Sequence, residues 1–203
     1  MKIQNYAQAT FETCLAVDLL QLTEEKISKD AELRTISYAM NFSKDNFTIG
    51  HLDFIAKNYD LELDFYVDNC RFLNLINKFK FSNKINVIHK KIGLNLINNL
   101  IKISPVILYV DSFALWKITH APHFIIVIQW TKDGYKIYDP WDGRIRTISS
   151  DTLSKGIINL RNLLKYCPQL IRRSNNLLRE FLLSSHNAIP IKEAIRRAKA
   201  KYS

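Results

Sequence analysis

Apolar residues recur every three or four positions along the first sixty residues, a spacing typical of amphipathic helices. This spacing predicts a helix over residues 11–22, helical structure that continues over residues 23–42, and a further short helix over residues 47–59. Thr10 or Thr13 can cap the first of them. The period then shortens to two, because the stretch LELDFYVD (61–68) alternates apolar residues with acids. This alternation predicts a half-buried strand.

The second half of the chain carries apolar runs of strand length. An amphipathic helix is expected over residues 93–104, ending before Pro105. Three strands should follow it, at residues 105–111, 123–130 and 134–140. The KDG sequence between the last two strands is a hairpin turn signal. Because helices come first and an antiparallel sheet second, the pattern predicts an α+β fold.

Helical spacing returns near residue 150. It predicts three further helices, over residues 150–167, 170–185 and 190–202. The chain has 203 residues, of which 47% are hydrophobic, enough for one domain with a helical appendage. We therefore predict a domain over residues 1–150 and a helical C-terminal extension over residues 151–203.

Positive charge is concentrated in the predicted extension. The whole chain has a net charge of +10, and residues 151–203 carry 11 basic and 3 acidic side chains. Residues 1–150 are nearly neutral, with 18 basic and 16 acidic side chains. Basic amphipathic helices can contact the body of the protein, another subunit, or an anionic partner such as nucleic acid or acidic lipid. Any electrostatic partner is therefore expected at the extension.

Cysteine usage indicates a reducing compartment. Cys14, Cys70 and Cys167 are widely spaced and form no CxxC pair, so neither a zinc site nor a disulfide framework is predicted. The first residues lack the apolar stretch of a signal peptide, and the longest apolar runs are too short to span a bilayer. We expect a cytoplasmic protein without a cofactor or a transmembrane segment. Cys70 and Cys167 are expected to pack in or near the core.

Cys14 stands apart because it falls in the first turn of the first predicted helix. The positive end of a helix favours the thiolate, which is the nucleophilic form of cysteine. His123 opens a predicted strand, and the hairpin should bring Asp139, sixteen residues later, beside it. An aspartate that accepts a hydrogen bond from an imidazole orients that imidazole as a general base. Gln8, six residues before the thiol, can donate to an oxyanion together with the Cys14 N–H.

These four residues occur in the order Gln8, Cys14, His123 and Asp139. The strand-like PVILYVD precedes the histidine, and YDPWDG surrounds the aspartate. In this order and spacing the chain resembles the papain-like cysteine peptidases. It is most similar to the branch that holds the double-glycine leader peptidases of bacteriocin exporters and their stand-alone relatives. The resemblance covers about residues 4–148 and implies a papain-like fold, in which the first helix carries the nucleophile and the N-terminal helices pack against an antiparallel sheet.

The resemblance also implies a role for each residue. Cys14 would be the nucleophile, His123 the general base, Asp139 the acid that orients it, and Gln8 part of the oxyanion hole. The implied activity is hydrolysis of a peptide or amide substrate through a thioester at Cys14. An acyltransferase with an amine or thiol acceptor would use the same thioester. The family usually has glycine after the catalytic cysteine, and Leu15 at that position leaves a catalytically silent binding module as a third hypothesis.

Neighbouring residues compete for two of these roles. His120 is an alternative to His123, but the Ala-Pro that follows it places it in a loop. Asp142 is an alternative to Asp139, but it lies in a turn sequence that favours local hydrogen bonds. Aromatic residues that can wall a substrate cleft or cap the core are Trp116 and Trp141. The remaining histidines are expected to be solvated, and they are His51, His89 and His186.

Overall fold

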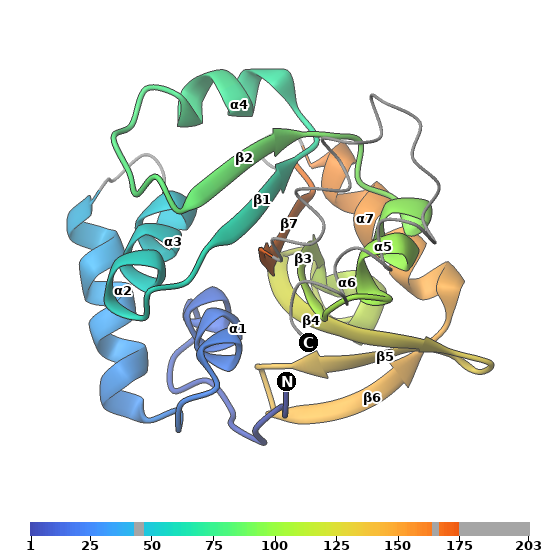
Figure 1. Ribbon diagram of the computed structural model, residues 1–203. Coiled ribbons are helices and arrows are strands. Elements are labelled where there is room, and N and C mark those ends of the chain that lie inside the picture. Colours follow the sequence, from blue (N-terminus) through green and yellow to red (C-terminus); the bar gives the residue numbers. More distant parts are fainter. Residues whose placement is uncertain (43–46, 164–166, 175–203) are drawn as a thin grey trace, which may run out of the picture. The chain divides into compact units, whose positions relative to one another are not determined.

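The computed structural model describes residues 1–42, 47–163 and 167–174, which are coloured in Figure 1. Met1–Arg173 forms one compact unit. The helix expected over residues 190–202 lies outside the described residues, as does most of the one expected over 170–185. The expected contact of this basic extension with a partner therefore also lies outside them.

Seven helices occur in the described residues: α1 (Cys14–Thr23), α2 (Lys29–Phe42), α3 (Phe47–Asn58), α4 (Cys70–Ile76), α5 (Leu94–Ile101), α6 (Ser112–Trp116) and α7 (Ser150–Asn162). The strands are β1 (Leu63–Val67), β2 (Ile85–His89), β3 (Val106–Asp111), β4 (Pro122–Thr131), β5 (Gly134–Asp139), β6 (Arg144–Ile148) and β7 (Gln169–Arg173). Within the described ranges, no helix is both long and apolar enough to cross a membrane.

The strands form one seven-stranded sheet in the order β2-β1-β7-β3-β4-β5-β6 (Figure 1). The α+β class is therefore confirmed, but the sheet is mixed and not purely antiparallel. The difference lies at one end, where β1 and β2 pair in parallel. Parallel neighbours need a crossover connection, and α4 lies in it. The sequence pattern predicted neither α4 nor β2, and it also missed α6 and β6.

The helix predicted over residues 23–42 is wrong at its beginning. Glu24 follows α1 with a left-handed backbone (φ 64°), which ends the helix. The next helix, α2, starts only at Lys29. The side-chain hydroxyl of the preceding residue, Ser28, accepts a hydrogen bond from the Ala31 N–H. Two separate helices therefore occupy the stretch from Cys14 to Phe42.

The helix predicted over residues 170–185 is also wrong at its beginning, because residues 169–173 form β7. This strand lies between β1 and β3 and is antiparallel to both. Leu170 pairs with Tyr66 and Leu108, and all three are buried. The compact unit consequently extends to Arg173, beyond the boundary near residue 150 that the sequence suggested.

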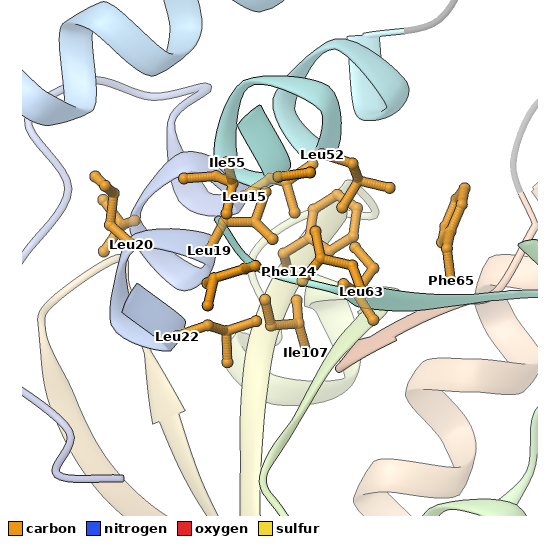
Figure 2. Close-up of a cluster of buried hydrophobic side chains, with 14 of the residues drawn as sticks. Leu15, Leu19, Leu20, Leu22, Leu52, Ile55, Leu63, Phe65, Ile107 and Phe124 are labelled. Carbon is orange, nitrogen blue, oxygen red and sulfur yellow. The ribbon is translucent and has the colours of Figure 1, made fainter. Parts of the chain in front are cut away.

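Two apolar cores lie on opposite faces of the sheet. In β4, Phe124 and Ile126 belong to the first core, whereas Ile125 and Val127 belong to the second. The second core includes residues of α5 and α7. The first includes α1 and α3, and Figure 2 shows their side chains meeting those of the sheet: Leu15, Leu19, Leu20, Leu22, Leu52, Ile55, Leu63, Ile107 and Phe124.

Candidate active site

Cys14 is the first residue of α1, and its side chain is half-buried. The N–H groups of a first helical turn have no partner within the helix, and they give this end of the helix a partial positive charge. Thr13 occupies the N-cap position, but its hydroxyl donates to the Thr10 carbonyl (2.9 Å) and makes no cap hydrogen bond. Every residue from Leu15 to Leu22 is buried, so the helix that carries the thiol is enclosed by the fold.

His123 and Asp139 form a buried pair at the open end of the β4–β5 hairpin. The distance from His123 Nε2 to Asp139 Oδ1 is 2.9 Å, and their side chains are 8% and 0% exposed. The same carboxylate oxygen accepts a hydrogen bond from the Trp141 N–H (2.9 Å). The hairpin predicted that these two residues would be neighbours, and the contact confirms it.

His123 also lies within interaction range of Cys14. Burial by itself would lower the pKa of His123, but hydrogen bonds to Asp139 and Cys14, and the charges of those groups, raise it to about 10. Because Nε2 is bonded to Asp139, Nδ1 is the ring nitrogen that remains free to interact with the thiol. The arrangement therefore favours an imidazolium between two acidic groups, one a thiol and the other a carboxyl.

Gln8 lies next to the histidine–aspartate pair but does not point a free donor at the thiol. Its backbone N–H donates to the Pro140 carbonyl (2.7 Å). Its side-chain Nε2 donates to the carbonyls of Thr10 (2.8 Å) and Phe11 (3.0 Å), which uses both amide hydrogens. The Oε1 atom is buried and has no hydrogen-bond partner among the described residues. Donation to an oxyanion would require Gln8 to release one of these carbonyls.

The segment before Cys14 is held by a residue that the sequence did not single out. Glu32 of α2 is fully buried and accepts hydrogen bonds from the Tyr6 hydroxyl (2.7 Å) and the Ala9 N–H (2.8 Å). An acid in an amphipathic helix is normally solvated, so the helical pattern gives no signal for this role. Glu32 fixes the chain on both sides of Gln8 and thereby orients the approach to the thiol.

A glycine brings the same segment against the end of β5. Gly143 has a left-handed backbone (φ 70°), and a Cβ atom there would lie 2.7 Å from the Ala7 nitrogen. The Tyr138 hydroxyl donates to the Tyr6 carbonyl, which adds a second link between the two segments. The turn sequence WDG marks Gly143 as a turn residue, but only the tertiary contact explains why a side chain is excluded.

The alternative residues make other contacts. His120 bonds through Nδ1 to Asp111 Oδ2 (2.8 Å) and stacks on Phe113, with half of its side chain exposed. Asp142 accepts hydrogen bonds from the Arg144 N–H and from the Arg146 guanidinium. Asp139 is therefore the carboxylate that bonds to His123.

The two tryptophans differ in their surroundings. Trp141 is half-exposed and packs edge-to-face on the exposed ring of Phe11, with 5.2 Å between ring centroids. These rings come from the segments that flank Cys14 and Asp139. Trp116 lies beneath the Arg146 guanidinium, 4.1 Å from its carbon, in a cation–π contact. Of the two tryptophans, Trp141 is thus the one nearer in sequence to the histidine–aspartate pair.

Two expectations about other residues are wrong. His51 was expected to be solvated, but it is fully buried in α3, where burial lowers its pKa to about 4 against the opposing hydrogen bond to the Phe47 carbonyl. Cys70 was expected to be packed, but it is exposed at the start of α4, and its sulfur lies 3.3 Å from His89 Nε2. The expectation for Cys167 is confirmed, because it is buried. The expectation for His89 is confirmed, because it is exposed, and the expectation for His186 falls outside the described residues.

A second acid lies on the same helix as Cys14. Asp18 is on α1, one turn after Cys14, and is fully buried. Neither carboxyl oxygen has a hydrogen-bond partner among the described residues. Burial, reinforced by the charges of Cys14 and Asp139 and opposed by His123, raises the pKa of Asp18 well above 3.8. An aspartate at the fourth position after the thiol shares its helix face, which is the sequence signal that could have identified it.

Within the described residues, no group of three or more His, Cys, Asp or Glu side chains could hold a metal ion. The chemistry that the site offers is that of a thiol, an imidazole and a carboxylate in contact. A scan against protein-family models found no match, and searches of curated proteins and of solved structures found none either. Function therefore has to be inferred from the geometry of the site itself.

Proposed function

We propose that the protein is a cysteine peptidase or amide hydrolase of the papain-like type. One observation carries the proposal: the buried imidazole of His123 is hydrogen-bonded to the carboxylate of Asp139 and lies within interaction range of the helix-borne thiol of Cys14. A nucleophile, a base and a group that orients the base are the parts that such a reaction needs. In this proposal the order of the elements, with the thiol on an N-terminal helix and the base and acid on a hairpin, corresponds to a papain-like fold.

The first half of the reaction forms a thioester. The Cys14 thiolate attacks the carbonyl carbon of the substrate, a C–S bond forms, and the carbonyl oxygen becomes an oxyanion. The N–H of Cys14, at the first position of α1, is free of helical partners and can donate to this oxyanion. The His123 imidazolium then gives its Nδ1 proton to the amine, and the C–N bond breaks.

Water completes the reaction. Neutral His123 takes a proton from a water molecule, whose oxygen attacks the thioester carbon. Collapse of this second intermediate releases a carboxylic acid and restores the thiolate beside the imidazolium. Asp139 keeps its hydrogen bond to Nε2 throughout, which holds the ring orientation and stabilises its positive form.

Leu15 bears on the hypothesis of a silent binding module. Its side chain is 2% exposed and lies in the first core, beside Leu19 and Ile55 (Figure 2). Replacement of the family's usual glycine by leucine therefore adds bulk to the core and leaves the thiol accessible. This placement supports catalysis over a purely structural use of the fold.

The test is the rate of iodoacetamide alkylation of each cysteine against pH, read by peptide mass spectrometry. We expect Cys14 to react rapidly well below pH 7 and His123→Ala to remove that reactivity. Cys167 is the internal control, since burial and the nearby Asp68 raise its pKa to about 11. If Cys14 titrates like a free thiol, near pH 8.5, the proposed function is wrong.

A second experiment tests the acyl step. The protein is incubated with an activated peptide ester and its intact mass is measured. We expect one acyl group on the wild-type chain, located at Cys14 and removed by hydroxylamine, as a thioester should be. Cys14→Ser is the matched control and should carry no hydroxylamine-sensitive group. Acylation of Cys70 alone would contradict the proposal.

A further inference from the structure

Asp18 is the buried charge-bearing group that the proposed reaction does not use. It lies one helical turn after Cys14, where side chains at positions i and i+4 share a face. It is 0% exposed, and its two oxygens have no hydrogen-bond partner in the described part of the chain. A buried polar group without a partner destabilises a fold, so its presence calls for a functional explanation.

The groups that face Asp18 are those of the site. Cys14 faces it from α1, His123 from β4, and Asp139 from β5, all within electrostatic range. Tyr138 of β5 also senses its charge. The other buried acid of this region, Glu32 of α2, acts on Tyr138 and is hydrogen-bonded.

Helix α3 also packs against α1, and it contributes apolar side chains to the contact. Leu52 and Ile55 of α3 meet Leu15 and Leu19 in the first core (Figure 2). No cation other than His123 is therefore available to Asp18 among the groups named. One imidazolium would have to balance a thiolate and two carboxylates if every acid were ionised.

A negative charge on Asp18 would have opposite effects on the Cys14 thiolate, which forms at lower pH, and on the His123 imidazolium, which is lost at higher pH. A negative Asp18 would oppose ionisation of Cys14, because it places two anions one helical turn apart. The same negative charge would help His123 to keep its proton, because it stabilises the imidazolium. An Asp18 that is neutral at the pH where Cys14 ionises would not oppose the thiolate. If it is negative at the higher pH where His123 loses its proton, it would still stabilise the imidazolium.

We propose that Asp18 is a positioning residue with a switchable charge, neutral where Cys14 ionises and negative where His123 would lose its proton. It thereby widens, toward alkaline pH, the range in which thiolate and imidazolium coexist. This inference rests on the proposed function, since it concerns the same thiol and imidazole. It assigns Asp18 no contact with the substrate.

The experiment compares wild type with Asp18→Asn, which keeps the shape of the side chain and removes its charge. Iodoacetamide alkylation of Cys14 against pH gives the point at which the thiolate forms. A ¹⁵N NMR titration of the His123 ring, assigned with His123→Ala, gives the point at which the imidazolium is lost. We expect the first point to be unchanged and the second to move about one to two pH units lower. Asp53→Asn is the matched control, because Asp53 is equally buried but bonds to Tyr38, Ser82 and Lys57.

Each other result overturns the inference. If both points move lower, Asp18 is negative throughout; removal of a unit charge about 6 Å away would shift thiolate formation by about two pH units. If neither point moves, Asp18 is neutral throughout. A wild-type Cys14 that titrates like a free thiol instead refutes the proposed function itself, so the two failures are distinguishable.

Discussion

Two cysteine–histidine pairs of similar construction lie in the described part of the chain. Cys14 begins α1 and meets His123 of β4, and Cys70 begins α4 and meets His89, the last residue of β2. Both thiols are at helix starts, and both imidazoles come from strands. The pairs differ in what surrounds them, because the first is largely buried and the second is exposed.

We infer from this difference that a helix start and a nearby imidazole do not by themselves make a thiol reactive. Water screens the charges of an exposed pair, and such pairs contribute little. The buried pair has Asp139 on the far nitrogen of the ring, whereas the described residues supply no hydrogen-bonded or ion-paired carboxylate to His89. We infer that burial and the third group, more than the cysteine–histidine contact, separate a catalytic pair from an ordinary surface contact.

The largest expected effect is on thiol reactivity. His123→Ala should lower the alkylation rate of Cys14 at pH 6 by about 300-fold, because a free thiol is only about 1 part in 300 thiolate at that pH. His89→Ala should change the rate at Cys70 by less than about threefold. Peptide mass spectrometry measures both in one digest. Equal losses at the two cysteines would abolish the distinction between the pairs.

The buried pair should also make the stability of the protein depend on pH. The pKa of His123 is raised from 6.5 to about 10 in the folded protein, so its stabilising effect is complete below pH 6.5 and lost as pH rises through about 10. The unfolding free energy of wild type relative to His123→Ala should therefore fall by ~2–4 kcal/mol across this window. Urea denaturation at several pH values measures it. A difference that stays constant with pH would show that His123 is neutral in the folded state.

The third group should have a smaller effect than the base. Asp139→Asn keeps a hydrogen-bond acceptor near Nε2 but removes the negative charge, and we expect Cys14 alkylation at pH 6 to fall by about tenfold. Asp111→Asn is the matched control, because Asp111 bonds to the half-exposed His120. It should leave the Cys14 rate within about twofold of wild type. A larger effect from Asp111 would indicate that the second histidine–aspartate pair takes part.

The smallest effect is expected at the exposed pair itself. Cys70→Ser and His89→Ala should each change the unfolding free energy by less than about 0.5 kcal/mol, as is usual for surface positions. Thermal denaturation of the two variants against wild type measures this. A loss comparable to that of His123→Ala would place Cys70 and His89 among the residues that stabilise the fold.

The sequence predicts the parts of the site that depend on local geometry. A hairpin fixes which residues lie opposite one another, so the proximity of His123 and Asp139 follows from the turn between them. Apolar spacing with Thr13 as a possible cap places Cys14 in the first turn of α1, although the helix begins at Cys14 and not at residue 11. The hydrogen bond from the Gln8 N–H to Pro140 and the buried position of Glu32 do not follow, because they depend on contacts between segments far apart in the chain.

The same reasoning explains the misassigned strand. Residues 169–173 read QLIRR, and leucine and arginine both favour helices, so local preference predicts a helix. Pairing with β1 and β3 overrides this preference, and Arg172 becomes fully buried, with its Nε 3.2 Å from Asp64. A buried arginine within a sheet cannot be read from composition, because arginine is rarely buried unless it is paired.

The position of β7 has a consequence for the order of events during translation. Cys14, His123 and Asp139 leave the ribosome well before Gln169–Arg173, the strand that lies between β1 and β3. Until that strand emerges, β1 and β3 each keep an edge unpaired, and the nascent sheet exists as two halves. The chain thus completes its sheet only when nearly the whole compact unit has been synthesised. We expect a nascent chain that ends before Gln169 to contain every residue of the thiol site and yet to lack the continuous sheet that supports it.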